Sequence, residues 1–164
     1  MINYRNQLYA FSSEGKAERY DPVFNGWSTL DMSTTRSAKV AVVRGEIYSL
    51  EINTTSKKST IKRFNVERCS WQTVLSSHEG CRVASYVVAA GNHLYVCGGL
   101  ESYFVAKAER FDTVESKWEE IANMQQKRGY ACGVATEEKI FSAGGCFEET
   151  VTVRCTIFLL MNGS

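Results

Sequence analysis

Residues 94–118 read LYVCGGLESYFVAKAERFDTVESKW, and the order of residues in this stretch recurs in two other parts of the chain. In each copy an arginine is followed directly by an aromatic residue and, eight positions after the arginine, by a tryptophan. A second arginine ends each copy. The copies span Ala17 to Arg36, Thr60 to Arg82 and Ala108 to Arg128. Because all three tryptophans of the chain follow one spacing rule, the sequence contains an internal repeat.

The repeat also contains an aliphatic residue followed by a tyrosine or phenylalanine. Two of these pairs, Leu94-Tyr95 and Ile140-Phe141, lead into double glycines that lie 46 residues apart. Glycines at the end of a strand allow positive φ and a close approach of backbones. We expect a structural role, packing between repeats or tight turns, for the signature residues Tyr9, Tyr20, Trp27, Tyr48, Trp71, Tyr95, Gly98, Gly99, Trp118, Gly144 and Gly145.

Short apolar runs at 39–43, 84–90 and 131–135 predict buried strands, each joined by a turn of two or three residues to a second strand. The arginine-aromatic segment and the tryptophan segment supply two more strands in each period. Four strands per period of about 46 residues are typical of a β-propeller blade. The sequence therefore predicts an all-β fold, a partial β-propeller of about three four-stranded blades and the start of a fourth. The predicted repeats are 1–44, 45–90, 91–136 and an incomplete repeat at 137–164 with a divergent C-terminal tail.

These residues resemble kelch repeats, and the resemblance extends from about Asn6 to Gly145. The pattern is fullest at 94–128, where the aliphatic-tyrosine pair, the double glycine, Glu109-Arg110-Phe111-Asp112, Trp118, Met124 and Arg128 all stand in register. This style of repeat is similar to the kelch half of the BTB-kelch (kelch-like) proteins. The resemblance implies a substrate-recognition module of a cullin-RING ubiquitin ligase, in which a BTB domain, absent from this chain, binds the cullin.

Three places depart from the pattern. Ser12-Ser13 and Leu50-Glu51 stand where the first and second repeats would have a double glycine. In the fourth repeat, Val153-Arg154-Cys155 falls near the expected arginine-aromatic position without an aromatic residue, and no tryptophan follows. Closed propellers use about four to eight blades. We therefore expect a fragment, a truncated isoform or an incomplete gene model, or self-association through open blade faces.

Composition excludes several classes of protein. The 164 residues are 44% hydrophobic and 23% charged, with a net charge of +1, so we expect no nucleic-acid partner. No apolar run is long enough for a membrane helix, and the segment that starts at Met1 lacks the apolar core of a signal peptide. We therefore expect a protein of the cytosol or nucleus. The six cysteines fit no zinc-site spacing and are expected to be free thiols: Cys69, Cys81, Cys97, Cys132, Cys146 and Cys155.

The sequence offers no catalytic or metal site and predicts no cofactor. The two histidines, His78 and His93, stand in different repeats, whereas the copper enzyme galactose oxidase, which some kelch-type propellers resemble, needs two histidines with tyrosines and a cysteine. Phosphate-loop and serine-hydrolase motifs are absent as well. We therefore expect a binding module and not an enzyme.

Five residues are candidates for partner binding. Arg36, Arg82 and Arg128 recur where one repeat leads into the next, and guanidinium groups at one rim would suit an acidic or phosphorylated peptide. Solvated or locally paired arginines are the alternative. Tyr103 and Phe104 form an aromatic pair in a polar loop, as expected of an interface hot spot or of packing onto a neighbouring loop.

Three functional hypotheses follow. The first is a substrate-recognition module of a ubiquitin-ligase adaptor, which would capture a protein or peptide substrate. The second is a cytoskeletal or scaffolding kelch module that binds actin or another assembly partner. The third is a truncated product whose role is lost or dominant-negative.

Overall fold

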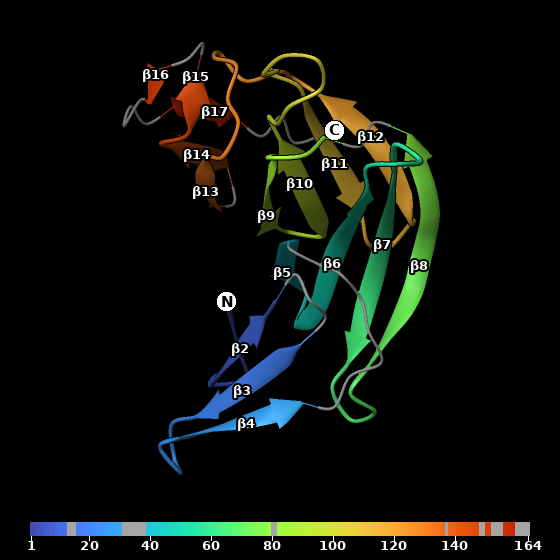
Figure 1. Ribbon diagram of the computed structural model, residues 1–164, viewed down its shortest axis with the longest axis vertical. Helices are drawn as coiled ribbons and strands as arrows, with labels where there is room; N and C mark the ends of the chain where they lie inside the picture. The colour runs from blue at the N-terminus through green and yellow to red at the C-terminus, as the bar shows by residue number, and fades with distance from the viewer. Residues whose placement is uncertain are drawn as a thin grey trace. The chain divides into compact units, whose positions relative to one another are not determined.

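The computed structural model describes residues 1–12, 16–30, 39–79, 82–136, 138–147, 150–151 and 156–159. Within these ranges every secondary-structure element is a β-strand, and the strands pair in antiparallel sheets (Figure 1). They fall into two compact units, Met1–Glu79 and Gly80–Ser164. The prediction of an all-β fold with four-stranded, propeller-type sheets is confirmed.

The first unit contains two four-stranded sheets in which strands that follow one another in the chain are neighbours. The first sheet consists of β1 (Ile2–Tyr4), β2 (Gln7–Phe11), β3 (Ala17–Asp21) and β4 (Gly26–Leu30). The second consists of β5 (Lys39–Val43), β6 (Glu46–Asn53), β7 (Lys58–Asn65) and β8 (Ser70–Glu79). Tight turns create this order. The two residues between β5 and β6, Arg44 and Gly45, have φ of 50° and 70°, which suits the twist of a two-residue hairpin.

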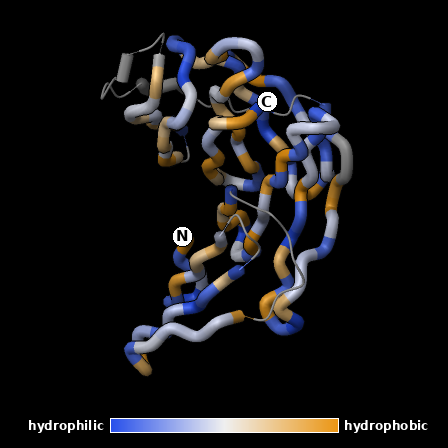
Figure 2. Tube along the Cα trace, viewed as in Figure 1, coloured by the Kyte–Doolittle hydropathy of each residue, from blue (hydrophilic) through white to orange (hydrophobic). Residues whose placement is uncertain are grey.

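Aromatic side chains hold the two sheets of the first unit together. Alternation of hydrophobic and hydrophilic residues along the strands (Figure 2) gives each sheet apolar side chains on its faces. Tyr9 and Phe11 on β2 share one core cluster with Ile47, Phe64 and Trp71 of the second sheet. The ring centroids of Phe11 and Trp71 are 5.5 Å apart. Trp71 thus packs between the two sheets of the first unit.

The second repeat shows what the missing double glycine changes. The strand register places Glu51 and Ile52, and not Leu50 and Glu51, at the positions of Gly98 and Gly99. Without glycines there, β6 continues without a break as far as Asn53, and β7 begins at Lys58 directly after the turn. The Lys62 Nζ lies 2.8 Å from a carboxylate oxygen of Glu51 across the paired strands. An ion pair in a longer hairpin therefore stands in place of a glycine turn.

The second unit contains the sheet whose sequence matches the repeat best. Its strands are β9 (Tyr86–Ala90), β10 (His93–Cys97), β11 (Ala108–Asp112) and β12 (Lys117–Ile121). The turn at Gly91-Asn92 joins β9 to β10, and the turn at 113–116 joins β11 to β12. Phe111 and Trp118 face each other across β11 and β12, with ring centroids 5.4 Å apart.

The fourth sheet has a third strand that the sequence pattern does not predict. It pairs β13 (Cys132–Ala135), β14 (Lys139–Ala143) and β17 (Thr156–Leu159), and a separate hairpin joins β15 (Cys146–Phe147) to β16 (Thr150–Val151). Phe158 lies opposite Ile140, just as Phe111 lies opposite Leu94 in the third sheet. Phe158 therefore occupies the aromatic register position expected near residues 153–155, because the loop that precedes it is longer.

The third and fourth sheets share a buried core. Tyr86, Val88, Tyr95 and Cys97 of the third sheet cluster with Ile140 of the fourth. Gly133 allows the close approach, since a Cβ at that position would lie 2.3 Å from the ring of Tyr86. Burial raises the pKa of the Cys97 thiol to about 12 and raises that of Tyr86 as well, so both groups stay protonated in this core.

The double glycine at 98–99 lets the end of β10 meet the chain segments beside it. Gly98 has φ of 64° and Gly99 of 110°, and a Cβ on Gly98 would lie 2.3 Å from the carbonyl oxygen of Arg128. The Gly99 amide donates a hydrogen bond of 2.7 Å to that same oxygen. The pattern requires glycine here because a side chain would occupy the place of this backbone contact.

The sheets and the sequence repeats are offset by one strand. The repeat boundaries at 44/45, 90/91 and 136/137 fall between the first and second strands of a sheet, since β5, β9 and β13 pair with the strands that follow them.

In the part of the chain that the structure describes, no helix has the length and hydropathy needed to cross a membrane.

Candidate functional site

A groove of about 770 Å³ lies beside the third sheet, between the loop that joins β10 to β11 and the segment that follows β12. Residues 101–108 line one side and residues 120–123 with Lys127 the other. The lining includes small apolar side chains, among them Ala106, Ala108 and Ala122, together with charged side chains such as Lys107 and Glu120. Its volume exceeds those of two other pockets, of about 470 and 320 Å³, and its mixed lining suits a peptide.

Backbone hydrogen bonds fix the shape of the loop at 100–107. The amides of Met124 and Arg128 donate to the carbonyls of Ala106 (2.8 Å) and Val105 (3.1 Å), and the Leu100 amide donates to Val83. The loop is therefore attached to the segments on both sides of it. A loop held in this way loses little conformational entropy when a partner binds.

The two aromatic residues of this loop differ in what they contact. Tyr103 is 80% exposed and lines the groove. Phe104 packs against Gly129, where a Cβ would lie 2.3 Å from its ring, and lies edge-on to Tyr130 at 6.4 Å between centroids. Phe104 thus follows the alternative of packing onto a neighbouring segment, whereas Tyr103 is accessible to a partner.

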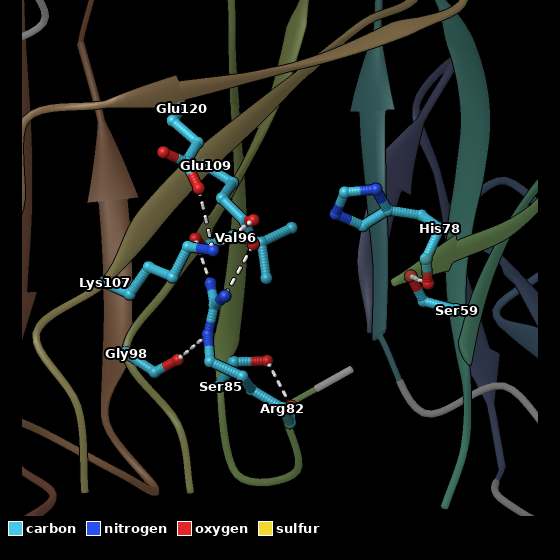
Figure 3. Close-up of polar contacts among 9 residues, drawn as sticks. All are labelled: Ser59, His78, Arg82, Ser85, Val96, Gly98, Lys107, Glu109 and Glu120. Carbon is cyan, nitrogen blue, oxygen red and sulfur yellow. Dashed lines mark hydrogen bonds and ion pairs between the residues drawn. The ribbon is translucent and has the colours of Figure 1, made fainter. Parts of the chain in front are cut away.

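Arg82 is buried, with 1% of its surface exposed. Its Nε donates to the Gly98 carbonyl at 2.8 Å and its Nη2 to the Val96 carbonyl at 3.2 Å, while Nη1 donates to the Glu109 carboxylate (Figure 3). Every nitrogen of the guanidinium is therefore directed at the third sheet itself. The charge is neutralised inside the protein by Glu109, whose side chain is 5% exposed.

Arg128 has the same relation to the fourth sheet. It is 1% exposed, and its Nη1 donates to the Gly144 carbonyl at 2.7 Å while Nη2 donates to the Gln126 side chain at 2.7 Å. Gly144 is the repeat equivalent of Gly98, so each arginine binds the carbonyl of the first glycine in the sheet that it precedes.

The burial of Arg82 and Arg128 corrects the expectation that these arginines line a peptide-binding rim. Both guanidinium groups donate hydrogen bonds to carbonyl and side-chain acceptors within the protein. Both are buried, so neither is accessible to an acidic or phosphorylated peptide. Arg36, the third arginine of this set, lies outside the described residues.

Lys107 connects the buried ion pair to the groove. Its Nζ lies 3.0 Å from carboxylate oxygens of both Glu109 and Glu120, and Lys107 and Glu120 line the groove (Figure 3). Partial burial lowers the pKa of Lys107, but the hydrogen bonds to Glu120 and Glu109 outweigh it and leave the pKa above its usual value. Lys107 thus stays charged and is held between two carboxylates.

The opposite end of the third sheet, at its hairpin turns, carries a second, more polar pocket of about 470 Å³. Its charges are already paired: Arg110 Nε donates to Glu119 at 2.7 Å, and His93 lies 3.3 Å from Asp112. In the second sheet Arg63 likewise lies 3.2 Å from Glu46. These arginines brace neighbouring strands. Among the described residues, no group of three or more His, Cys, Asp or Glu side chains is arranged to hold a metal ion.

The sequence reasoning missed Glu109, Lys107 and Glu120, the residues that connect the core with the groove. Glu109 belongs to the repeat pattern, but its partner Arg82 lies 27 residues away in the chain. Sequence spacing within one repeat gives no signal for such a pair. The repeated arginine at the end of each copy was the only indication that a buried acceptor exists.

Comparisons with known proteins agree with this architecture. The family described as "Kelch motif" matches residues 81–125, which include the third sheet and Arg82. Kelch-like protein 25 of Xenopus tropicalis is 25% identical over 144 residues, 85% of this chain and 24% of that protein. Kelch-like protein 25 of Homo sapiens is 25% identical over 143 residues, with the same coverage. Kelch repeat and BTB domain-containing protein 1 of Camelpox virus (strain CMS) is 26% identical over 141 residues, 84% of this chain and 24% of that protein.

The fold and these matches define a protein-interaction module built from kelch repeats. Residues 81–125 match the kelch motif, and the chain as a whole is similar to kelch-like proteins. It spans about a quarter of the length of the curated relatives named above.

Proposed function

We propose that this chain is the substrate-recognition part of a cullin-RING ubiquitin ligase adaptor of the BTB-kelch type, and that the groove beside the third sheet captures the substrate. The observation that carries the binding site is the groove itself, with exposed Tyr103 on a loop held at both ends. Exposed aromatic side chains next to small apolar ones are typical of interface hot spots. In this proposal the bound segment is a peptide or loop of another protein.

The adaptor role is supported by similarity to kelch-like proteins and to a viral protein whose name states both kelch repeats and a BTB domain. The ligase connection would require a BTB domain joined to this chain. The proposed place of action is the cytosol or nucleus, where cullin-RING ligases would meet such an adaptor. No catalytic role is proposed, because the groove holds no nucleophile paired with a base among its described lining residues.

Filling the groove tests the binding site. Ala122 is exposed and lines the groove, so Ala122→Trp should block it without disturbing the core. Val114→Trp, at the exposed turn between β11 and β12, is the matched control. Linear peptides selected against the unmodified chain from a random library should bind the control with unchanged affinity and lose binding to Ala122→Trp. Equal binding to both variants would contradict the proposed site.

The ligase role needs a separate experiment. The longest natural product that contains this chain should be expressed in cells and precipitated. Recovery of a cullin would support the adaptor proposal, whereas recovery of actin filaments without a cullin would support a scaffolding kelch protein instead.

A further inference from the structure

The segment 124–130, which follows the third sheet, is bonded both to the groove and to the chain that follows β14. The Arg128 amide donates a hydrogen bond of 3.1 Å to the carbonyl of Val105, a residue that lines the groove. One position later, Gly129 and Cys146 exchange two backbone hydrogen bonds, of 3.2 and 2.8 Å. Consecutive residues of this segment therefore hold the groove loop on one side and the fourth repeat on the other.

The backbone of Arg128 belongs to a closed ring of three hydrogen bonds. The Gly99 amide donates to the Arg128 carbonyl at 2.7 Å, and the Arg128 amide donates to the Val105 carbonyl. The Val105 amide closes the ring with a hydrogen bond of 3.0 Å to the Gly99 carbonyl. Because each of the three residues is bonded to both of the others, a shift of the groove loop has to move Arg128 as well.

The side chain of Arg128 extends this contact to the glycine segment, which we define as residues 144–146. Its Nη1 donates to the Gly144 carbonyl at 2.7 Å, and only 1% of the residue is exposed. Gly145 packs tightly beside it, since a Cβ there would lie 2.5 Å from the Gly129 carbonyl oxygen. Close-packed interiors transmit displacements because they have little room to absorb them. Arg128 therefore ties the glycine segment to the groove loop.

We propose that Arg128 is a positioning residue of the groove and couples the binding of a peptide there to the glycine segment. This inference rests on the proposed function and assigns a regulation to that same groove. A bound peptide restricts the loop at 100–107, and the ring of hydrogen bonds then fixes Arg128 together with its hydrogen bond to Gly144. Coupling between two sites is reciprocal, so a change that loosens the glycine segment also weakens peptide binding.

Hydrogen exchange of the unmodified chain tests the coupling without a substitution. The probe is a peptide from the random library that loses binding to Ala122→Trp, and exchange is followed by NMR with and without it. Exchange at the Gly129 and Cys146 amides, which are not among the residues that line the groove, should slow about fivefold or more. A groove-bound peptide that protects Val105 and leaves both of these amides unchanged would overturn the coupling alone. Selected peptides that bind Ala122→Trp equally well would overturn the groove and the coupling together.

Variants of Arg128 test whether its side chain carries the coupling. Arg128→Met removes the donor to Gly144 and should weaken peptide binding about fivefold or more and abolish the slower exchange at Gly129. Arg128→Lys keeps a donor and should restore both. Gln126→Ala, which removes the side-chain acceptor of the same guanidinium, is the matched control and should retain the coupling.

Two results in these variants would overturn the proposal. The first is slower exchange at Gly129 that persists in Arg128→Met, and the second is its loss in Arg128→Lys as well. If Arg128→Met loses its β-sheet circular dichroism spectrum, Gly145→Ala takes its place, because the added Cβ displaces the glycine segment from the Gly129 carbonyl. The peptide should then bind more weakly to Gly145→Ala, although Gly145 does not line the groove, and unchanged affinity would contradict the coupling.

Discussion

The Arg82 guanidinium donates a hydrogen bond to the Glu109 carboxylate at a place where both side chains are almost completely buried. The same guanidinium binds the carbonyls of Gly98 and Val96 at the end of β10. One side chain therefore joins the segment before β9 to the second and third strands of its sheet. The glycine, the arginine and the glutamate of the repeat pattern thus form a single structural unit.

Glu109→Gln should lower the free energy of unfolding by about 3–5 kcal/mol, because it leaves the buried charge of Arg82 without its partner. Urea denaturation measures the change. Glu46→Gln is the control, since the side chains of Glu46 and its partner Arg63 are 46% and 42% exposed and solvent-exposed pairs contribute less than about 1 kcal/mol. Similar losses in the two variants would show that the buried pair contributes no more to the free energy of unfolding than the exposed pair.

Replacing both members of the buried pair separates the cost of an unpaired charge from the value of the pair. Arg82→Met alone should be more destabilising than Arg82→Met combined with Glu109→Leu, because the double variant leaves no buried carboxylate facing an apolar side chain. The four free energies of unfolding form a double-mutant cycle. Additive losses would mean that Arg82 acts through the carbonyls of Val96 and Gly98 and not through Glu109.

Gly98→Ala should destabilise the protein more than Gly144→Ala. Both glycines have positive φ, 64° and 68°, so both variants carry the cost of a left-handed alanine, about 1–2 kcal/mol. At Gly98 the added Cβ also meets the Arg128 carbonyl oxygen at 2.3 Å, whereas nothing lies within 4 Å of a Cβ at Gly144. Thermal unfolding of the two variants isolates the contact from the backbone conformation. Equal shifts in Tm would rule out the contact as a separate contribution.

Much of the fold could be predicted because the repeat signature reports on local structure and on face-to-face packing. The order of strands, the hairpin at Arg44-Gly45 and the packing role of Trp71 all follow from residues close in the sequence. The third strand of the fourth sheet was not predicted, because loop length is not encoded in the pattern. Only the pairing of Phe158 with Ile140 reveals where that strand lies.

The candidate site was harder to predict because arginine burial depends on distant acceptors. Arginines are mostly exposed in proteins, so a repeated arginine suggests a surface role. The second repeat shows how indirect the signal is: Lys62 takes the place of Glu109 and Glu51 that of Gly98, and these two residues pair with each other at 2.8 Å. A repeat can thus lose the glutamate and the glycine and replace both by a different ion pair.

Cys97 should resist alkylation in the folded protein, whereas Cys132 should react. Thiolates are the reactive form, and burial raises the pKa of Cys97 to about 12 while Cys132 is exposed. Iodoacetamide labelling at pH 8 followed by mass spectrometry gives the extent of reaction at each residue, and labelling in denaturant serves as the control. Rapid labelling of Cys97 in the native protein would contradict the packed core of the third and fourth sheets.

The same pKa has a consequence for stability at high pH. Between about pH 9, the ordinary value, and pH 12 the native state keeps a proton on Cys97 that the unfolded state releases. The free energy of unfolding should therefore fall as the pH rises through this range. Cys97→Ser should weaken this dependence, and urea denaturation at several pH values measures it. An unchanged slope in Cys97→Ser would assign the effect to other groups, such as Tyr86.

Tyr103→Ala should weaken peptide binding and Phe104→Ala should loosen the loop, although the two residues are neighbours. Tyr103 is exposed in the groove, so its removal should weaken the binding of selected peptides at least tenfold, by about 1.4 kcal/mol or more, and leave Tm unchanged. Phe104 packs on Gly129, so its removal should raise the rate of hydrogen exchange at residues 100–107. Peptide titration and hydrogen exchange of both variants check the two expectations. Faster exchange in Tyr103→Ala, or peptide binding unchanged by it, would assign the loop a purely structural role.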